Sequence, residues 1–153
     1  MIAFPKMNAN VLDAKLTAVL HGRGQRVTPQ RLILHRLLRA GPQHLTAEEL
    51  LGRSRTQLPN VSLPTVYATL DLFEQLGVVR RVPGTGPAQV YDSRVDLHHH
   101  ARCLRCGRVS DLDADLDAAA AAAAARAQGF APERVEVVVT GLCGDCAAAP
   151  SAA

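Results

Sequence analysis

The N-terminal half of this chain carries apolar residues at the spacing of amphipathic helices. Thr28 precedes Pro29, a pair typical of an N-cap and a first helical turn. Thr46 and Glu49 form a capping box, and Ser62 is a further N-cap. The pattern predicts helices over residues 10–21, 29–40 and 46–57, and from 62 through 73.

From Val78 the apolar period shortens and predicts a β-hairpin. Strands are expected over residues 78–82 and 89–92, with the segment 83–87, rich in proline and glycine, as a wide connecting loop. Helices followed by such a hairpin are typical of a winged helix-turn-helix, in which one helix enters the major groove of DNA. We therefore predict a winged-helix DNA-binding domain over residues 1–92.

Residues 93–97 form an expected hinge before a second domain at 98–146. The pattern there predicts strands over 98–102, 108–112 and 134–140 and an alanine-rich helix over 113–128 with aspartates in its first turn, where the helix dipole favours them. Residues 147–153 are expected to be a disordered tail. The predicted fold class is α+β, with an N-terminal winged helix-turn-helix domain and a small C-terminal α/β domain.

Charge is divided unevenly between these parts. Residues 1–95 carry 12 Lys and Arg against 6 Asp and Glu, whereas residues 96–153 carry 5 against 8. A basic part joined to an acidic part suggests a polyanion-binding domain attached to a sensing or assembly domain. The alternative is chance segregation of solvated surface charge.

Composition also bears on where the protein works. No apolar run approaches the length of about 18 residues that a membrane span needs, so none is expected. Residues 1–6 lack the long apolar stretch of a signal peptide. Thiols used as metal ligands suit a reducing interior. We expect a cytoplasmic protein.

The four cysteines of the chain form two Cys-x-x-Cys pairs in the second domain. Zinc prefers four tetrahedral thiolates, and a spacing of two residues lets both sulfurs of a pair meet one ion. The pairs predict a structural Zn2+ site, with two disulfides or a redox-active pair as the alternatives. The predicted zinc ligands are Cys103, Cys106, Cys143 and Cys146.

A different kind of ligand set begins directly before the first cysteine pair. In a strand, His98 and His100 share one face while His99 points the other way. Imidazoles combined with carboxylates suit iron, manganese or zinc. If His44 of the N-terminal domain joins them, one ion connects the two domains and can bias their conformation. The alternative is that these side chains are only polar surface. The candidate ligands are His44, Asp92, His98, His100 and Asp111.

Candidate DNA contacts lie on and around the predicted recognition helix. With Val66, Leu70 and Phe73 facing the core, its N-terminal outward face offers hydroxyl and aromatic groups that can meet phosphates or a thymine methyl. Arginines before the second helix and on the wing could reach phosphates. The alternative is an ordinary surface helix. The candidate contacts are Arg26, Ser62, Thr65, Tyr67, Thr69 and Arg80, with Arg23 and Arg81 beside them.

Four segments carry a resemblance to a known family: residues 26–31 (RVTPQR), 61–67 (VSLPTVY), 98–107 (HHHARCLRCG) and 141–146 (GLCGDC). In this order and spacing they resemble the ferric uptake regulator (Fur) family of bacterial metal-dependent repressors, over residues 10–146. The resemblance implies a homodimer with a winged-helix domain and an α/β dimerisation domain. It also implies binding to palindromic, usually AT-rich operators in double-stranded DNA.

By position, the resemblance assigns the four cysteines to the structural zinc site of the family and the five His and Asp residues to its regulatory site. Tyr67 matches the recognition-helix tyrosine, and Arg26 matches a basic residue that enters the minor groove. The regulatory site lacks the cysteine of zinc sensors and has aspartate at both carboxylate positions. It is therefore similar to the peroxide-sensing branch and to actinobacterial-type regulators of catalase genes.

In that branch, the resemblance implies that peroxide reacts at Fe2+ and oxidises a ligand histidine, here His44 or His98, whereas Mn2+ is a non-reactive corepressor. An iron-homeostasis repressor is the alternative, followed by manganese and nickel sensors of the same family. Leu97 and Ala118 stand where some relatives have ligands of a third metal site, so that site is expected to be weak or absent unless His99 contributes.

Two classes of protein outside the family are alternatives. His98, His100 and Asp111 could form the two-histidine, one-carboxylate centre of a non-haem iron oxygenase. A zinc-stapled adaptor that never binds DNA is the other possibility. The sequence shows no phosphate-cradling or nucleophile motif and no series of strands that could enclose a substrate. We therefore expect a regulator and not an enzyme.

Overall fold

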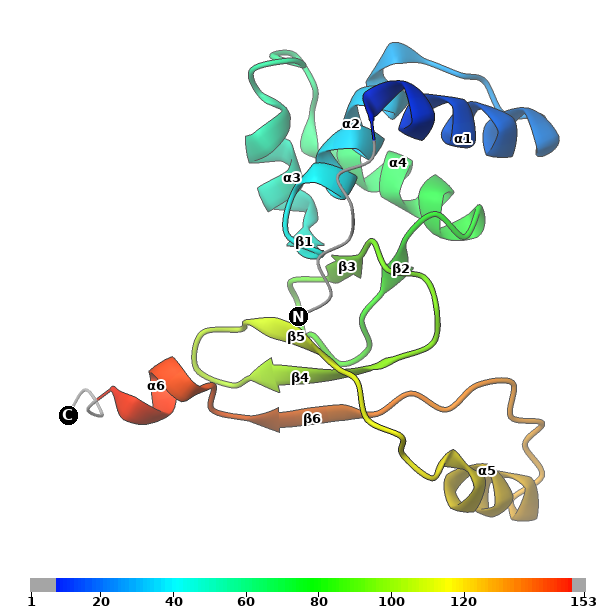
Figure 1. Ribbon diagram of the computed structural model, residues 1–153, viewed down its shortest axis with the longest axis vertical. Helices are drawn as coiled ribbons and strands as arrows, with labels where there is room; N and C mark the ends of the chain where they lie inside the picture. Colours follow the sequence, from blue (N-terminus) through cyan, green and yellow to red (C-terminus); the bar gives the residue numbers. More distant parts are fainter. Residues whose placement is uncertain (1–7, 150–153) are drawn as a thin grey trace. The chain divides into compact units, whose positions relative to one another are not determined.

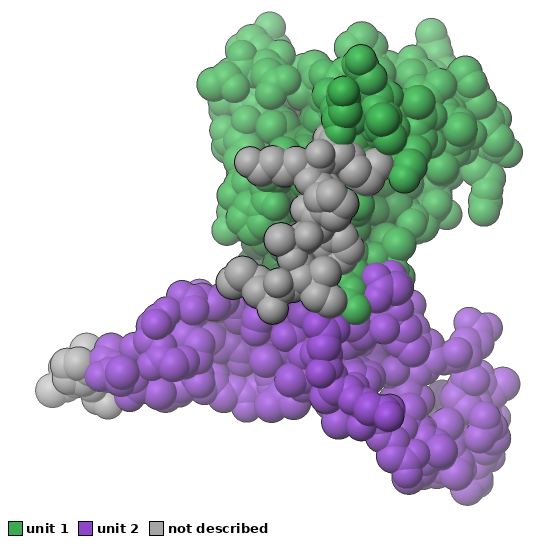
Figure 2. All heavy atoms as spheres, viewed as in Figure 1, with its two compact units in different colours: residues 1–82, 86–95 green, residues 83–85, 96–153 purple. Residues whose placement is uncertain are grey.

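The computed structural model describes residues 8–149 and divides them into two compact units. Unit 1 comprises residues 8–82 and 86–95, and unit 2 comprises residues 83–85 and 96–149 (Figure 2). Two expectations concern residues outside the described part of the chain. They are the absence of a signal peptide at residues 1–6 and the disorder of residues 150–153. Among the described helices, none combines the length and the apolar character needed to cross a membrane.

Unit 1 contains four helices, and their starts agree with the sequence (Figure 1). The side chains of Thr28, Thr46 and Ser62 each accept a hydrogen bond from the backbone N–H three residues later, so the predicted caps are confirmed. The third helix ends at Ser54 and not at residue 57, because the N–H groups of Gln57 and Leu58 turn back to the Ser54 carbonyl ahead of Pro59. The helices are α1 (Ala9–Gly22), α2 (Pro29–Ala40), α3 (Ala47–Ser54) and α4 (Leu63–Gln75).

A small antiparallel sheet completes unit 1. Its strands β1 (His44–Thr46), β2 (Arg80–Arg81) and β3 (Val90–Asp92) lie in the order β1-β3-β2. Strands β2 and β3 are the predicted hairpin, with β2 shortened at both ends and β3 shortened at its start. Strand β1 was not predicted, because three residues between two helices are too few to show a period of two.

The core of unit 1 lies between its helices and this sheet. Leu20, Leu34 and Phe73 are fully buried, and Tyr91 of β3 is 1 % exposed. Burying a side chain of this size contributes about 1.5–3 kcal/mol to the free energy of unfolding. Residues 66, 70 and 73 belong to this core, so the face of α4 that was predicted to point inward does so.

Unit 2 is built on the sheet β5-β4-β6, with β4 (His99–Cys103) in the centre. Strand β5 (Val109–Leu112) pairs antiparallel with β4, and β6 (Val138–Gly141) pairs parallel with it (Figure 1). Helix α5 (Ala118–Ala127) precedes β6, and helix α6 (Gly144–Ala148) follows it. The predicted α+β fold class is confirmed.

Two elements of unit 2 start four or five residues later than predicted, and one helix was not predicted. Helix α5 starts at Ala118 and not at residue 113, because Asp117 is its N-cap and accepts a hydrogen bond from the N–H of Ala119 at 2.9 Å. Aspartate is a better N-cap than a helix-interior residue, so the preceding aspartates lie outside the helix. Strand β6 starts at Val138 and not at residue 134. Helix α6 was not predicted, and it includes residues 147 and 148 of the expected tail.

Candidate metal centres

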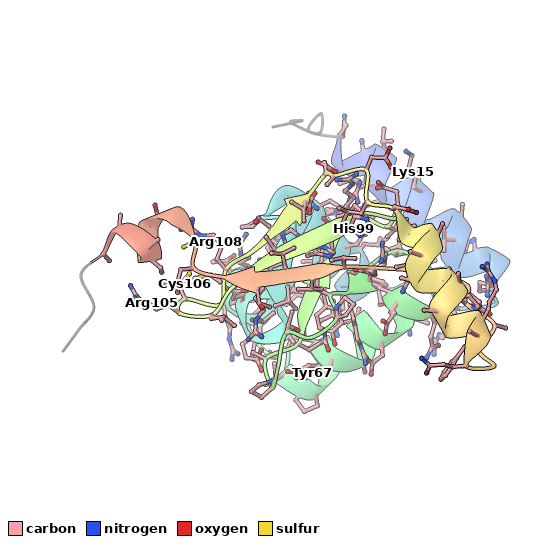
Figure 3. All side chains as sticks on the ribbon, turned by 90° about the horizontal axis from the view of Figure 1, so that it is seen from below. Lys15, Tyr67, His99, Arg105, Cys106 and Arg108 are labelled. Carbon is pink, nitrogen blue, oxygen red and sulfur yellow. The ribbon has the colours of Figure 1, made fainter. Side chains whose placement is uncertain are left out.

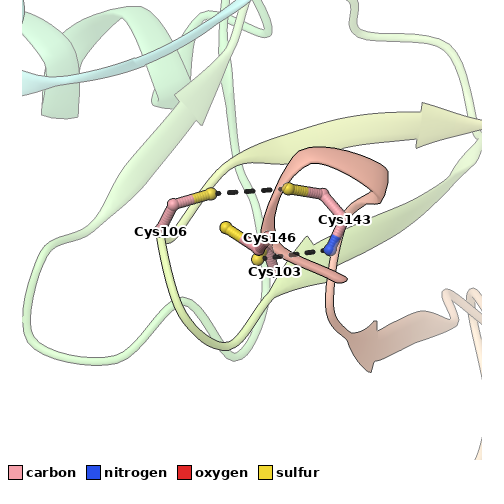
Figure 4. A group of neighbouring side chains, drawn as sticks. All are labelled: Cys103, Cys106, Cys143 and Cys146. Atoms are coloured by element: carbon pink, nitrogen blue, oxygen red, sulfur yellow. Dashed lines mark hydrogen bonds between the residues drawn. The ribbon is translucent and has the colours of Figure 1, made fainter. Parts of the chain in front are cut away.

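The four cysteines meet where the central strand of unit 2 ends and α6 begins. Cys103 ends β4, Cys106 follows in the turn, and Cys143 and Cys146 flank the first turn of α6 (Figure 4). Their sulfur atoms all lie within 4.8 Å of one another. The Cys106 and Cys143 sulfurs are 3.8 Å apart. This is the edge of a tetrahedron with metal–sulfur bonds of about 2.3 Å, and it is far longer than a disulfide bond. The cluster therefore fits one Zn2+ and does not fit two disulfides.

Backbone and charged groups around the cluster suit thiolates. The N–H of Cys143 donates to the Cys103 sulfur at 3.3 Å. Hydrogen bonds from the backbone of Cys106 and then Cys143 lower the pKa of the Cys103 thiol to about 5, whereas the neighbouring Cys143 and other thiol groups raise the pKa of Cys146. When thiols lie this close together, ionisation of one makes ionisation of the next harder. A cation bound between them removes this repulsion.

Two arginines lie at the same end of unit 2 (Figure 3). Arg105 donates to the Cys146 carbonyl, and Arg108 pairs with Asp145 at 2.7 Å. Both contacts tie the turn after β4 to helix α6. They therefore hold together the two segments that supply the cysteine pairs.

His98, His100 and Asp111 of unit 2 come together at the start of β4. One ligand atom from each lies within 4.8 Å of the others, and the two imidazole rings are 4.5 Å apart. His98 Nδ1 lies 2.8 Å from the Asp96 carbonyl oxygen. A carbonyl only accepts, so the hydrogen is on Nδ1 and the lone pair is on Nε2. That Nε2 faces Asp111 Oδ1 at 3.2 Å, and two acceptors this close suit a cation between them.

His44 and Asp92 of unit 1 form a second His–Asp pair. They stand opposite each other in the β1–β3 register, with His44 Nε2 3.5 Å from Asp92 Oδ2. The other carboxylate oxygen of Asp92 accepts the N–H of Arg94 at 2.7 Å, which fixes the group. The structure thus sorts the five predicted ligands into two in unit 1 and three in unit 2.

Glu136 was not among the predicted site residues, although it contacts one of them. Its Oε1 lies 3.2 Å from His100 Nδ1, and its side chain is 6 % exposed. One feature of the sequence could have pointed to this contact. Glu136 stands between Val135 and Val137, and a carboxylate buried among apolar residues is costly unless its charge is paired. His99 has a different partner, since its Nδ1 accepts the Val137 N–H at 3.2 Å.

The predicted DNA-contacting residues are distributed unevenly over unit 1. Arg26 and Ser62 are exposed, and Tyr67 donates its hydroxyl to Glu48 at 2.9 Å, a hydrogen bond that raises the pKa of the tyrosine. The outward position predicted for Thr69 is wrong. Its side chain is 6 % exposed and its hydroxyl donates to the Thr65 carbonyl of its own helix.

The two wing arginines also differ. Arg80 is partly buried, with its Nε enclosed. Arg81 is engaged by α4: it binds Asp71, lies 3.0 Å from Glu74, and stacks at 5.7 Å over the ring of Tyr91. The guanidinium of Arg81 therefore already holds the hairpin to α4, and this pairing does not favour the phosphate contact expected of it.

A helical domain with a β-hairpin, joined in one chain to a metal-suited cysteine cluster and His–Asp pairs, defines the class of metal-responsive transcriptional regulators. The sequence profile described as "Ferric uptake regulator family" matches residues 22–140. The chain belongs to this family.

Relatives within the family carry two kinds of name. The chain is 35% identical over 122 residues to the "Transcriptional regulator FurA" of Mycobacterium tuberculosis, covering 79% of this chain and 82% of that protein. It is 29% identical over 135 residues to the "Peroxide-responsive repressor PerR" of Staphylococcus saprophyticus, covering 88% and 90%. A solved structure described as "Zinc Uptake Regulator Complexed With Zinc AND DNA" aligns with a TM-score of 0.69 at 28% identity, covering 92% and 96%.

Proposed function

We propose that this protein is a homodimeric, cytoplasmic repressor whose binding to operator DNA depends on a regulatory metal ion. The observation that carries the proposal is the arrangement of the His and Asp side chains. His44 and Asp92 face each other in unit 1, and His98, His100 and Asp111 converge in unit 2. Imidazole and carboxylate groups of this kind can bind a metal ion, and in this proposal DNA binding requires that ion.

The regulatory ion in this proposal is Fe2+ or Mn2+. Its donors are imidazole nitrogens and carboxylate oxygens with no thiolate, a set that suits both ions. The separate cysteine cluster takes Zn2+ and stabilises unit 2, since a structural zinc site contributes directly to folding.

The homodimer is supported by the surface of unit 2. Among its described residues, Cys103 is the one apolar side chain that is buried, and α5 buries none. Phe130, Val139 and Leu142 are each at least half exposed. A second copy of unit 2 is the partner proposed to cover them, and a twofold dimer would present two recognition helices to a palindromic, AT-rich operator.

We further propose peroxide as the signal, on the basis of the match to peroxide-responsive repressors and of Asp92 and Asp111 as the two carboxylates. Peroxide would transfer one oxygen atom to a nearby histidine, which is oxidised by two electrons, and the other oxygen atom would leave as water. Bound Fe2+ would mediate this transfer. His44 and His98 are the proposed acceptors, and loss of either imidazole as a ligand would release DNA. Iron-responsive repression is the second candidate, favoured by the match to FurA.

One experiment tests this series of proposals. An operator is first selected from a random pool of DNA duplexes with Mn2+-loaded protein, and binding is then followed by fluorescence anisotropy. We expect binding to require Mn2+ or anaerobic Fe2+, and peroxide to abolish it only in the Fe2+ form, with one added oxygen on the peptide of His44 or His98. Fe2+-dependent binding that survives peroxide without this adduct would instead identify the iron-responsive branch. If the protein selects no DNA duplex, with or without metal, the proposal that it is a repressor is contradicted.

A further inference from the structure

His100 of the central strand lies between two carboxylates. On one side, Asp111 of β5 is its direct partner in the antiparallel register. On the other side, Val138 of β6 is its parallel partner, and Glu136 comes two residues before Val138 on the same face. The side chains of His100 and Glu136 are 1% and 6% exposed, so their contact is shielded from water.

We propose that Glu136 is a positioning residue of the regulatory metal site, an inference that rests on the proposed function. Its Oε1 lies 3.2 Å from the Nδ1 of His100. In this proposal, the negative carboxylate beside Nδ1 favours the tautomer with the hydrogen on Nδ1, which leaves the lone pair on Nε2 for the ion. Carboxylates that hold metal-binding histidines in this way fix the tautomer and make the imidazole a stronger ligand.

His98 provides an internal comparison. Its Nδ1 is held by the Asp96 carbonyl, a neutral acceptor, at 2.8 Å. The group beside the Nδ1 of His100 is a carboxylate, whose second oxygen lies 3.7 Å from the exposed Arg134. A charged acceptor draws more of the Nδ1 proton than a neutral one. The structure therefore assigns His100 as the more strongly donating imidazole, and Glu136 as the cause.

The test compares Glu136→Gln and Glu136→Ala with Glu133→Ala, which removes an exposed carboxylate three residues earlier. The first readout is the 15N NMR spectrum of the imidazoles in protein without a regulatory ion, which reports the tautomer of each ring. The second is the Kd for Mn2+ by titration. In the wild type and in Glu133→Ala, we expect the Nδ1–H tautomer at His100.

Glu136→Gln keeps an acceptor oxygen but loses the charge, so we expect the same tautomer and a roughly 10-fold weaker Kd for Mn2+. Glu136→Ala should leave His100 as a mixture of tautomers, keep His98 unchanged, and weaken Mn2+ binding by roughly 100-fold. A residue that only packs would change the melting temperature and leave the His100 tautomer and the Gln variant's Kd as in the wild type. That outcome would overturn the inference.

Direct coordination of Mn2+ by the Glu136 carboxylate, detected by pulsed EPR, would also overturn it, because the residue would then be a ligand. His100→Ala separates this inference from the proposed function. If that variant binds Mn2+ normally, the regulatory site itself is wrong. If it loses Mn2+ while Glu136→Ala binds as the wild type does, only the role of Glu136 is wrong.

Discussion

His44 and Asp92 are direct partners across the antiparallel pair β1–β3, with the imidazole Nε2 3.5 Å from the carboxylate. A strand of three residues between two helices thus brings a loop histidine to the last residue of the wing. Because backbone pairing sets their separation, the fold itself places the two side chains next to each other. A metal site built on this pair should therefore depend on both His44 and Asp92.

Asp92→Asn keeps the size of the side chain and removes its charge. We expect the Kd for Mn2+ to rise at least ~10-fold. Replacing a residue that only holds a metal ligand in place costs this much, and replacing the ligand itself should cost no less. Operator binding should lose its dependence on Mn2+, while the circular dichroism spectrum stays that of the wild type. Asp115→Asn, at an exposed position in unit 2, is the matched control and should bind Mn2+ normally. Normal Mn2+ affinity in Asp92→Asn would exclude Asp92 as a ligand.

Cys143→Ser should remove zinc, because serine cannot replace a thiolate in the four-sulfur cluster. Elemental analysis should fall from one zinc per chain to none, and the melting temperature should drop, since the site contributes to folding. Leu142→Ala changes the exposed neighbouring side chain and should keep its zinc. A Cys143→Ser protein that retains one tightly bound zinc would show that the cluster is not the zinc site.

Arg26 and Arg81 should respond differently to salt. Arg26 is exposed, so Arg26→Ala should reduce the slope of log K against log salt for operator binding by about 1. Arg81 is occupied by Asp71 and Glu74, so Arg81→Ala should leave that slope unchanged and lower the stability by at most about 1 kcal/mol. Equal slopes for Arg26→Ala and the wild type would remove Arg26 from the DNA contacts.

His35 should make the protein sensitive to mild acid. Burial against Phe73, and then the charge of Arg39, lower the pKa of His35 from 6.5 to about 4. The unfolded chain therefore binds a proton more readily than the folded one, and this contribution to stability is complete above pH 6.5 and is lost as the pH falls toward 4. The shift corresponds to about 3 kcal/mol at most.

Urea unfolding at pH 7.5 and pH 5 measures this contribution. His35→Leu should unfold with a smaller difference between the two pH values than the wild type. His21→Leu replaces a histidine that is exposed in α1 and should keep the wild-type difference. An unchanged difference in His35→Leu would show that other groups govern the acid sensitivity.

Local chemistry allowed most of the helices to be predicted. Thr28, Thr46 and Ser62 satisfy the first free N–H groups of their helices, so each start was visible in a few residues. The same holds for the cysteine cluster, because each pair needs only a short turn to bring its sulfurs together. The start of α5 was predicted wrongly because Asp117 competes with the earlier aspartates for the cap, and only the folded chain shows which carboxylate accepts the hydrogen bond from the first turn.

Sequence alone determined the elements, the zinc-binding cysteines and the face shared by His98 and His100, because each depends on residues close together in the chain. Tertiary structure decided what depends on distant segments. The pairing of β1 with β3 placed Asp92 against His44, the parallel pairing of β4 with β6 brought Glu136 to His100, and packing against α4 occupied Arg81. The first contact joins residues 48 positions apart in the chain, and the second joins residues 36 positions apart. No local spacing encodes the strand register that creates them.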